Sequence, residues 1–242
     1  MAVSRNANAG KSVVTNPEIS IIIPTLNEED SLKKTLDALQ IFGGDVEIII
    51  VDGGSDDVTL AIAENYRVKI LHAPRGRGMQ LQIGGDAATG DILWFLHADT
   101  IAAPDCVRQI KRSLQNKMVA GGNFTIRFDG EKFAAKFLTW LYPNLRKLGL
   151  IYGDSAIFAR REIYEKIGGF KPYPIFEDLD FIQRLRNEGD VVTLPATVTT
   201  SSRRFEKGSF ILTFARWSIL QILYWLGVNP ETLLKIYFPN AK

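Results

Sequence analysis

The chain has 242 residues, enough for one large domain with a substantial buried core. Its 29 basic and 27 acidic residues leave a net charge of +2, which gives no electrostatic reason to expect nucleic-acid binding. Hydrophobic residues make up 46% of the chain, as in ordinary globular proteins, and the single Cys106 excludes an intramolecular disulfide, which favours a cytoplasmic location.

Residues 1–18 are small and polar, and they contain no long apolar run. We expect a flexible leader there rather than a secretory signal. Gly10-Lys11-Ser12 suggests a phosphate-binding loop, but Arg5 stands where that motif requires a glycine. We therefore expect the folded domain to begin at residue 19.

The first half of the domain alternates short apolar runs with segments of helical pattern, which predicts an α/β fold with a mostly parallel sheet flanked by helices. Asn27 is expected to cap the first helix, and Ser55 or Asp56 the second. A third helix is expected near residues 79–88, after a loop that contains two arginines. The expected strands cover residues 19–23, 46–51, 68–71 and 92–96.

After Pro104 the alternation becomes less regular. Alternating apolar residues predict a long strand with a glycine break, followed by three shorter strands. Helices are expected up to about residue 114, around the aromatic residues that begin at Phe133, and from Glu177 to Asn187. The strands in this half are expected at residues 119–128, 156–159, 191–194 and 197–200.

Carboxylates follow two of the predicted strands at the point where each strand ends. Asp52 comes directly after the second strand, and Asp99 follows the fourth strand in His97-Ala98-Asp99-Thr100. The carboxyl ends of parallel strands line the ligand crevice of an open α/β sheet. A carboxylate there is costly to bury unless it binds a metal, a donor or a cation. This pairing indicates a site for a nucleotide and a divalent ion.

Four motifs in this order resemble the family 2 glycosyltransferases, which have the GT-A fold. The resemblance covers roughly residues 19–205 and is closest to a small bacterial single-domain subgroup, with Arg-Gly-Arg-Gly before the metal motif and histidine at that motif's first position. The motifs are Pro24-Thr25-Leu26-Asn27-Glu28-Glu29, Val51-Asp52-Gly53-Gly54-Ser55-Asp56-Asp57, His97-Ala98-Asp99-Thr100 and Phe176-Glu177-Asp178-Leu179-Asp180.

The resemblance implies that residues 19–100 bind a nucleotide-diphosphate sugar and residues 101–205 bind a hydroxyl acceptor, which is a lipid, a metabolite or a glycan. It also implies that Asp99, with His97 beside it, holds Mg²⁺ or Mn²⁺, hard ions that prefer oxygen ligands. The expected donor-binding residues are Pro24, Thr25, Asn27, Glu28, Asp52, Gly53, Arg75, Arg77, His97, Ala98 and Asp99.

The resemblance further implies that one residue of the pair Glu177-Asp178 is the general base of a single inverting displacement, and Asp178 is favoured. The sequence alone leaves the choice open. Asp154 is expected to contact a hydroxyl or a phosphate on the acceptor side, and Arg203 and Arg204 to clamp the diphosphate.

The sequence departs from the family pattern at two positions. His97 replaces the first aspartate of the usual metal motif, and Gly53 replaces a second acid that is common after Asp52. The identity of the metal therefore stays open. The Gln-x-x-Arg-Trp segment of processive synthases is missing, so we expect a non-processive enzyme.

Two other functions are compatible with the same features. A sugar-1-phosphate nucleotidyltransferase also uses Mg²⁺ on a nucleotide-binding sheet, but it has a glycine-rich loop after the first strand, where this chain has Pro24-Thr25-Leu26-Asn27. A catalytically silent membrane-associated scaffold of this fold is the third alternative.

Residues 206–242 form a separate hydrophobic segment in which we expect amphipathic helices. Its apolar stretch 209–228 approaches the length of a membrane span, but Arg216 near the middle makes spanning costly, by about 2.5 to 3.5 kcal/mol on insertion scales. The stretch is equally compatible with docking at the inner membrane surface and with packing on this domain or on a second copy of the chain.

Overall fold

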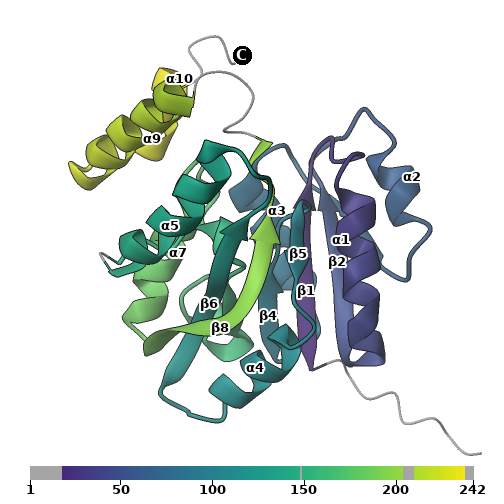
Figure 1. The fold of residues 1–242 in the computed structure, drawn as a ribbon. Coiled ribbons are helices and arrows are strands. Elements are labelled where there is room, and N and C mark those ends of the chain that lie inside the picture. The colour runs from purple at the N-terminus through teal and green to yellow at the C-terminus, as the bar shows by residue number, and fades with distance from the viewer. Residues whose placement is uncertain (1–17, 148, 204–209, 238–242) are drawn as a thin grey trace, which may run out of the picture.

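The computed structural model of the chain describes residues 18–147, 149–203 and 210–237. One curled sheet of eight strands runs through the described part, with helices on both of its faces (Figure 1). The strand order is β3-β2-β1-β4-β7-β6-β8-β5. The strands are β1 (Ile19–Thr25), β2 (Val46–Asp52), β3 (Lys69–His72), β4 (Ile92–Phe95), β5 (Thr100–Ala102), β6 (Val119–Phe128), β7 (Phe158–Arg160) and β8 (Asp190–Thr200).

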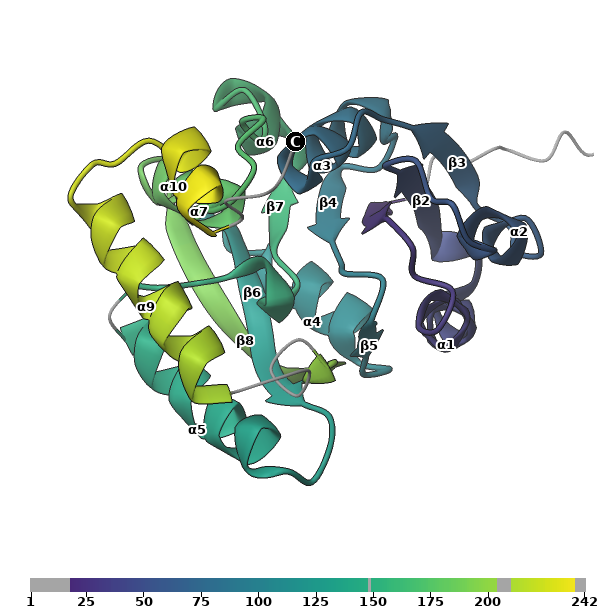
Figure 2. The ribbon, with the colours of Figure 1, turned by 90° about the horizontal axis from the view of Figure 1, so that it is seen from above.

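The helices vary in length from single turns to four turns, and Figure 2 shows from above how they surround the sheet. Two of them are short 3₁₀ helices, η1 (Gln40–Asp45) and η2 (Gly153–Ser155). The α-helices are α1 (Leu32–Leu39), α2 (Thr59–Ala63), α3 (Arg77–Ala87), α4 (Cys106–Ser113), α5 (Phe133–Lys147), α6 (Arg161–Lys166), α7 (Glu177–Arg186), α9 (Phe210–Trp225) and α10 (Pro230–Tyr237).

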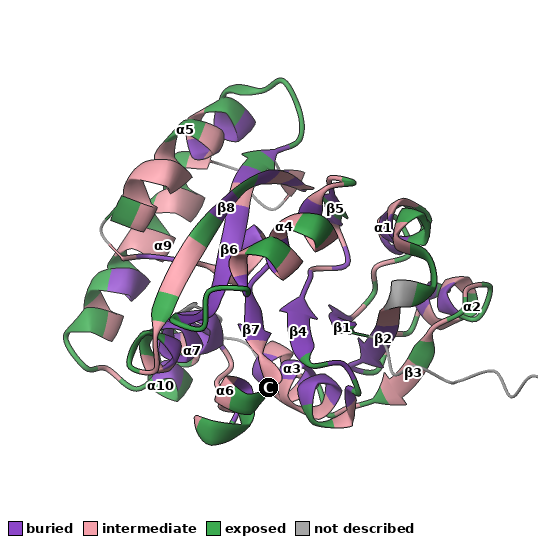
Figure 3. Cartoon of the chain, turned by 90° about the horizontal axis from the view of Figure 1, so that it is seen from below, coloured by how far each residue is buried: buried purple, intermediate pink, exposed green. Residues whose placement is uncertain are grey.

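The central strands are the continuous apolar runs of the sequence. Every residue of β1 and β4 is buried, because helices cover both faces of the sheet there (Figure 3). The strand β1 pairs in parallel with β2 and β4, and the register sets Thr25 opposite Asp52. These strands therefore end at nearly the same level, which is the geometry that the predicted nucleotide site requires.

The predicted mostly parallel sheet is confirmed, with antiparallel pairings in its second half. Four pairings are parallel, β1 with β2, β1 with β4, β2 with β3, and β6 with β8. The strand β7 runs antiparallel to β4 and β6, and β5 runs antiparallel to β8. Because β5 follows β4 in sequence but pairs with β8 at the far edge, the segment His97-Ala98-Asp99 crosses from one part of the sheet to the other.

Both predicted helix caps are wrong. Ser31 precedes α1, whereas Asn27 has a left-handed backbone and its side-chain oxygen accepts a hydrogen bond from the N–H of Asp56. The helix α2 starts only at Thr59, whose N–H donates to the side chain of Asp57. The polar residues after β1 and β2 thus tie two loops together instead of starting helices.

Three predicted strands also differ from the structure. The segments expected at 191–194 and 197–200 are one strand, β8, which continues through an irregularity in its pairing with β6. The strand expected at 156–159 begins at Phe158, because Ala156 has a left-handed backbone, with φ of 55°.

The helix α3 lies very close to the sheet because of a glycine. A β-carbon at Gly84 would lie 2.4 Å from a methyl group of Ile22 and 2.8 Å from one of Val51, so a larger residue would push the helix away. This close approach places the start of α3, with Arg77, beside the ends of β1 and β2.

The C-terminal helices α9 and α10 pack on the domain. Their inner side chains, among them Leu220 and Leu233, form a small apolar cluster with Leu150, Phe176 and Leu179. Figures 1 and 2 show α9 alongside α5. No helix in the described residues is both long enough and apolar enough to cross a membrane.

Candidate active site

The carboxylate of Asp52 is held by the turn that follows β2. Its oxygens accept hydrogen bonds from the N–H groups of Gly54 and Ser55, both at 2.9 Å, and from the hydroxyls of Ser55 and Thr25. Burial disfavours the charged form, but these hydrogen bonds outweigh it and lower the pKa of Asp52. The residue is only 1% exposed, so it shapes the turn from within.

Gln80, which lies in none of the four sequence motifs, connects the ends of β1 and β2. Its side-chain N–H₂ donates to the carbonyls of Thr25 and Val51, each at 2.8 Å. The same side chain packs against Gly53, where a β-carbon would lie 3.1 Å from it. The one signal for Gln80 in the sequence was that it is a polar residue on the buried face of a predicted helix.

A polar cavity of about 800 Å³ opens at these strand ends. We call it the polar cavity. Asn27, Asp52 and Gly53 lie beside it without lining it, whereas most of the other predicted residues contribute to its wall. The predicted residues that line it are Pro24, Thr25, Glu28, Arg75, Arg77, His97, Ala98, Asp99, Asp154 and Arg203.

Two carboxylates on one wall of the polar cavity share a single guanidinium. Arg203 pairs with Glu28 and lies 3.6 Å from a carboxylate oxygen of Asp99. Burial raises the pKa of Glu28, Arg203 lowers it, and the negative charge of Asp99 raises it again. This wall therefore has an excess of negative charge that would favour an additional cation. Arg204 lies outside the described residues.

His97 is oriented by Asp154. The imidazole Nδ1 lies 3.1 Å from one carboxylate oxygen of Asp154, and the hydroxyl of Tyr142 donates to the other oxygen at 3.2 Å. A proton on Nδ1 would favour this contact and would leave Nε2 as the nitrogen able to accept a hydrogen bond. That nitrogen faces Gly153, where a β-carbon would lie 3.0 Å away. Within the described residues, no group of three or more potential metal ligands comes together.

Glu177 and Asp178, at the start of α7, have different surroundings. Glu177 is fully buried and pairs with Arg77. The Oδ2 atom of Asp178 accepts a hydrogen bond from the N–H of Gly153 at 2.6 Å and lies 3.9 Å from the guanidinium of Arg77. Burial, reinforced by the neighbouring Glu177, raises the pKa of Asp178 to about 6, against the lowering effect of Arg77.

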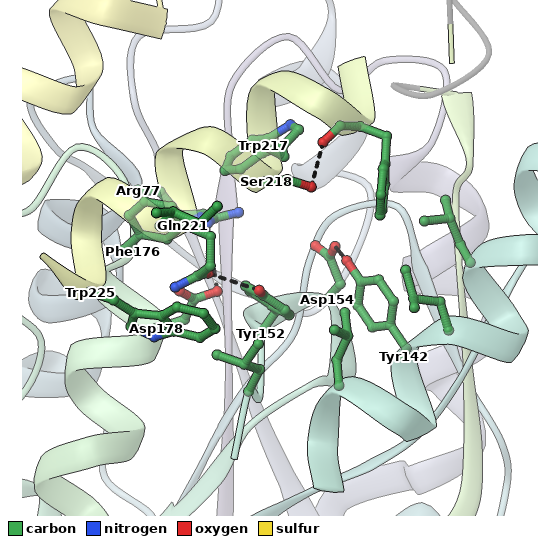
Figure 4. A pocket seen from close by; sticks show the side chains of 16 residues that line it. Arg77, Tyr142, Tyr152, Asp154, Phe176, Asp178, Trp217, Ser218, Gln221 and Trp225 are labelled. Carbon is green, nitrogen blue, oxygen red and sulfur yellow. Dashed lines mark hydrogen bonds and ion pairs between the residues drawn. The ribbon is translucent and has the colours of Figure 1, made fainter. Parts of the chain in front are cut away.

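Asp178 lines a second cavity, of about 270 Å³, whose other walls are mainly apolar (Figure 4). We call it the apolar cavity. It shares Arg77 and Asp154 with the polar cavity. The two cavities therefore meet at a pair of charged residues, next to a buried carboxylate with a raised pKa.

The structure thus gathers most of the predicted residues at one place. The acids at 99, 154 and 178 all line cavities that meet at Arg77, whereas Glu177 is enclosed behind that arginine. Such an arrangement offers cationic groups for an anionic ligand on one side and a carboxylate able to take up a proton on the other.

Comparison with known proteins agrees with this geometry. The sequence model of the family described as "Glycosyl transferase family 2" matches residues 20–171. An uncharacterized glycosyltransferase of Mycobacterium tuberculosis is 33% identical over 189 residues, which cover 74% of this chain and 72% of that protein.

Solved structures of low sequence identity share the fold. TarS of S. aureus, in complex with UDP-GlcNAc, superposes with a TM-score of 0.64 at 17% identity, over 76% of this chain and 58% of that one. Glucosyl-3-phosphoglycerate synthase from Mycobacterium tuberculosis, in complex with Mn²⁺, UDP and glucosyl-3-phosphoglycerate, has a TM-score of 0.54 at 23% identity, over 75% and 70%. The predicted GT-A fold is confirmed.

Proposed function

The chain belongs to glycosyl transferase family 2, and from that premise we propose that it transfers a sugar from a nucleoside diphosphate sugar to a hydroxyl acceptor by a single inverting displacement. The observation that carries the proposal is the meeting of the polar and apolar cavities at Arg77 and Asp154, beside Asp178. One substrate in each cavity would bring its reacting atom to that junction.

The polar cavity is suited to the donor. Its volume, about 800 Å³, is in the range of small-molecule sites, and Arg75, Arg77 and Arg203 line it. Guanidinium groups bind phosphate oxygens through two parallel hydrogen bonds. Because Arg77 and Arg203 already pair with Glu177 and Glu28, Arg75 would supply most of the positive charge for the diphosphate. We assign contacts with the base and the ribose to Thr25, the last residue of β1, and to Glu28, in the loop that follows it.

A divalent metal fits the acidic wall of this cavity. Asp99 would hold Mg²⁺ or Mn²⁺ together with the donor phosphates, and the negative charge that Arg203 leaves uncompensated on Glu28 and Asp99 supports this placement. When bound, the ion would act as a Lewis acid on the departing diphosphate. The structural neighbour with Mn²⁺ and UDP supports the same choice of ions.

Asp178 is the proposed general base. Glu177 is fully buried and neutralised by Arg77, whereas Asp178 lines a cavity. In the displacement, the acceptor oxygen bonds to the anomeric carbon as the bond to the diphosphate breaks, and the acceptor proton passes to Asp178. Attack from the face opposite the leaving group inverts the configuration. His97 and Asp154 would position the polar end of the acceptor.

We also infer that one sugar is transferred per encounter, since the sequence lacks the segment typical of processive synthases. The nucleotidyltransferase alternative is disfavoured by the family assignment and by Pro24-Thr25-Leu26-Asn27 after β1. Release of pyrophosphate from a nucleoside triphosphate and a sugar 1-phosphate would reinstate it.

Asp178→Asn tests the function and the base together. Transfer, or hydrolysis of the sugar nucleotide by water, should fall by about 10² to 10⁴-fold, the usual effect of losing a general base. Calorimetry should show unchanged affinity for the nucleoside diphosphate, which a thermal-shift screen with Mg²⁺ and Mn²⁺ would first identify. Asp91→Asn, the same change at an exposed residue before β4, is the control.

Two results would contradict the proposal. Full activity of the Asp178→Asn protein would remove Asp178 as the base. Absence of any nucleotide binding by the unaltered protein would favour the silent scaffold instead.

A further inference from the structure

The apolar cavity is walled chiefly by carbon atoms from α5, α9, residues 150–154 and the segment before α7. Leu138, Leu141 and Leu145 come from α5, Phe176 precedes α7, and α9 supplies residues that include Trp217. Among the described residues that line the cavity, only Arg77, Asp154 and Asp178 are charged. The cavity therefore has one polar end, at the proposed reaction centre, and an apolar body.

We propose that this cavity holds the acceptor, and that the acceptor carries its reacting hydroxyl on an apolar group such as an alkyl chain or an aromatic ring. The proposal rests on the function proposed above and specifies the acceptor class. An apolar group gains free energy on entering such a cavity, whereas a sugar would lose its hydrogen bonds to water without replacement.

The polar atoms in the body of the cavity are mostly engaged within the protein. The hydroxyl of Tyr152 donates to the side-chain oxygen of Gln221 at 2.9 Å, and the hydroxyl of Ser218 donates to the carbonyl of Phe214 (Figure 4). The Tyr142 hydroxyl donates to Asp154. A polyhydroxylated acceptor would find few groups ready to bind it here, which favours the apolar alternative.

The side chain of Gln221 is an exception, because one of its polar atoms has no partner in the described residues. It is 7% exposed, and its Nε2 has no hydrogen-bond partner among the described residues, although it lines the cavity. A buried donor without a partner costs free energy, and an acceptor oxygen would remove that cost. We assign Gln221 the role of donating one hydrogen bond to an oxygen at the polar end of the acceptor.

The apolar cavity reaches the surface along α9. Ile222 and Trp225 line it and are also 52% and 60% exposed. The exposed Leu226 directly follows Trp225 at the end of α9. An apolar group longer than the cavity can therefore extend outward, so the acceptor can be a free alcohol or phenol, or a lipid presented at a membrane surface.

Binding of simple alcohols tests the acceptor class without any donor. Quenching of tryptophan fluorescence would measure the affinity of 1-hexanol, 1-octanol and 1-decanol, with glycerol and glucose as polar comparators. Each added methylene should tighten binding by about fourfold until the cavity is filled, because burying a methylene contributes about 0.8 kcal/mol. Affinity that is independent of chain length, or equal affinity for glucose, would overturn the proposal.

A matched pair of variants on α9 locates the site. Ser218 lines the cavity and its neighbour Ile219 points outward with 55% exposure. Ser218→Phe should weaken decanol binding at least tenfold, whereas Ile219→Phe should change it less than twofold. Leu141→Trp fills the same cavity from α5 and replaces Ser218→Phe if that protein does not fold. Equal behaviour of the cavity and surface variants would contradict the assignment.

Two further measurements separate the remaining questions. Binding of oleyl alcohol in phosphatidylcholine vesicles would identify a lipid as the source, whereas binding of free alcohols alone would identify a soluble one; both support an apolar acceptor. Hydrolysis of the donor by water is measured separately. Hydrolysis without alcohol binding refutes only the acceptor class. Alcohol binding without nucleotide binding refutes the proposed function, and the cavity is then an apolar binding site but not an acceptor site.

Discussion

The guanidinium of Arg77 forms an ion pair with the carboxylate of Glu177, which lies one hundred positions later in the chain. Arg77 begins α3 and Glu177 begins α7, so the contact joins residues 19–100, proposed to bind the donor, to residues 101–205, proposed to bind the acceptor. Asp178, the next residue along α7, lines the apolar cavity beside this pair. The ion pair therefore fixes the position of the proposed base relative to the polar cavity.

Removal of Arg77 should destabilise the fold. In Arg77→Met, Glu177 is left fully buried without its cation, a change that typically costs about 3 to 5 kcal/mol. The double variant Arg77→Met with Glu177→Gln should recover most of this loss, since the buried charge is gone. Urea unfolding of the unaltered protein, the single variant and the double variant measures both the loss and the recovery of stability. A double variant as unstable as the single one would show that Arg77 stabilises the fold by other contacts.

Catalysis should depend on the ionisation of Asp178. A base must be deprotonated, and the pKa of this carboxyl is raised to about 6, so kcat should rise as the pH increases from 5 to 7 and then level. Glu177→Gln removes a negative neighbour that raises the pKa, so the rise should move to lower pH. The pH profile of kcat at saturating donor measures the shift. A profile that does not move would mean that another group controls the rate.

Metal dependence should be lost with Asp99. Asp99→Asn should abolish stimulation by Mn²⁺ and weaken Mn²⁺ binding in the presence of the nucleoside diphosphate, while thermal stability stays close to that of the unaltered protein because Arg203 keeps its pair with Glu28. Asp91→Asn, at the opposite end of β4, should leave the response to metal unchanged. Undiminished stimulation of the Asp99 variant would place the metal elsewhere.

Gly78 should tolerate no side chain. A β-carbon there would lie 2.5 Å from the carbonyl oxygen of Lys171 and 2.8 Å from that of Tyr173, in the loop that leads to α7. Gly78→Ala should therefore lower stability by about 1 to 3 kcal/mol and reduce activity by displacing that loop. A β-carbon at Gly44 would have no neighbouring atom within 4 Å, so Gly44→Ala should change the free energy of unfolding by less than about 0.5 kcal/mol. Thermal unfolding of the two variants decides the point.

The fold class could be predicted because its signals are local. The buried runs of β1, β2 and β4 are continuous apolar segments, and their order with the intervening helices already indicates a parallel sheet. The three-residue strand β5 could not be predicted, since it is defined by pairing with β8 about one hundred residues later. Asn27 was wrongly expected to cap a helix because its contact is with Asp56, in another loop.

For the candidate site, the sequence alone determined which acids follow the strand ends and in which order, because strand ends are set by local apolar patterns. It did not decide whether Glu177 or Asp178 is the base. It also did not determine what the segment 209–228 packs against. Only the tertiary structure enclosed Glu177 behind Arg77, directed Asp178 into a cavity and packed α9 above it. The physical reason is that burial and charge pairing depend on residues far apart in sequence, whereas periodicity depends on neighbours.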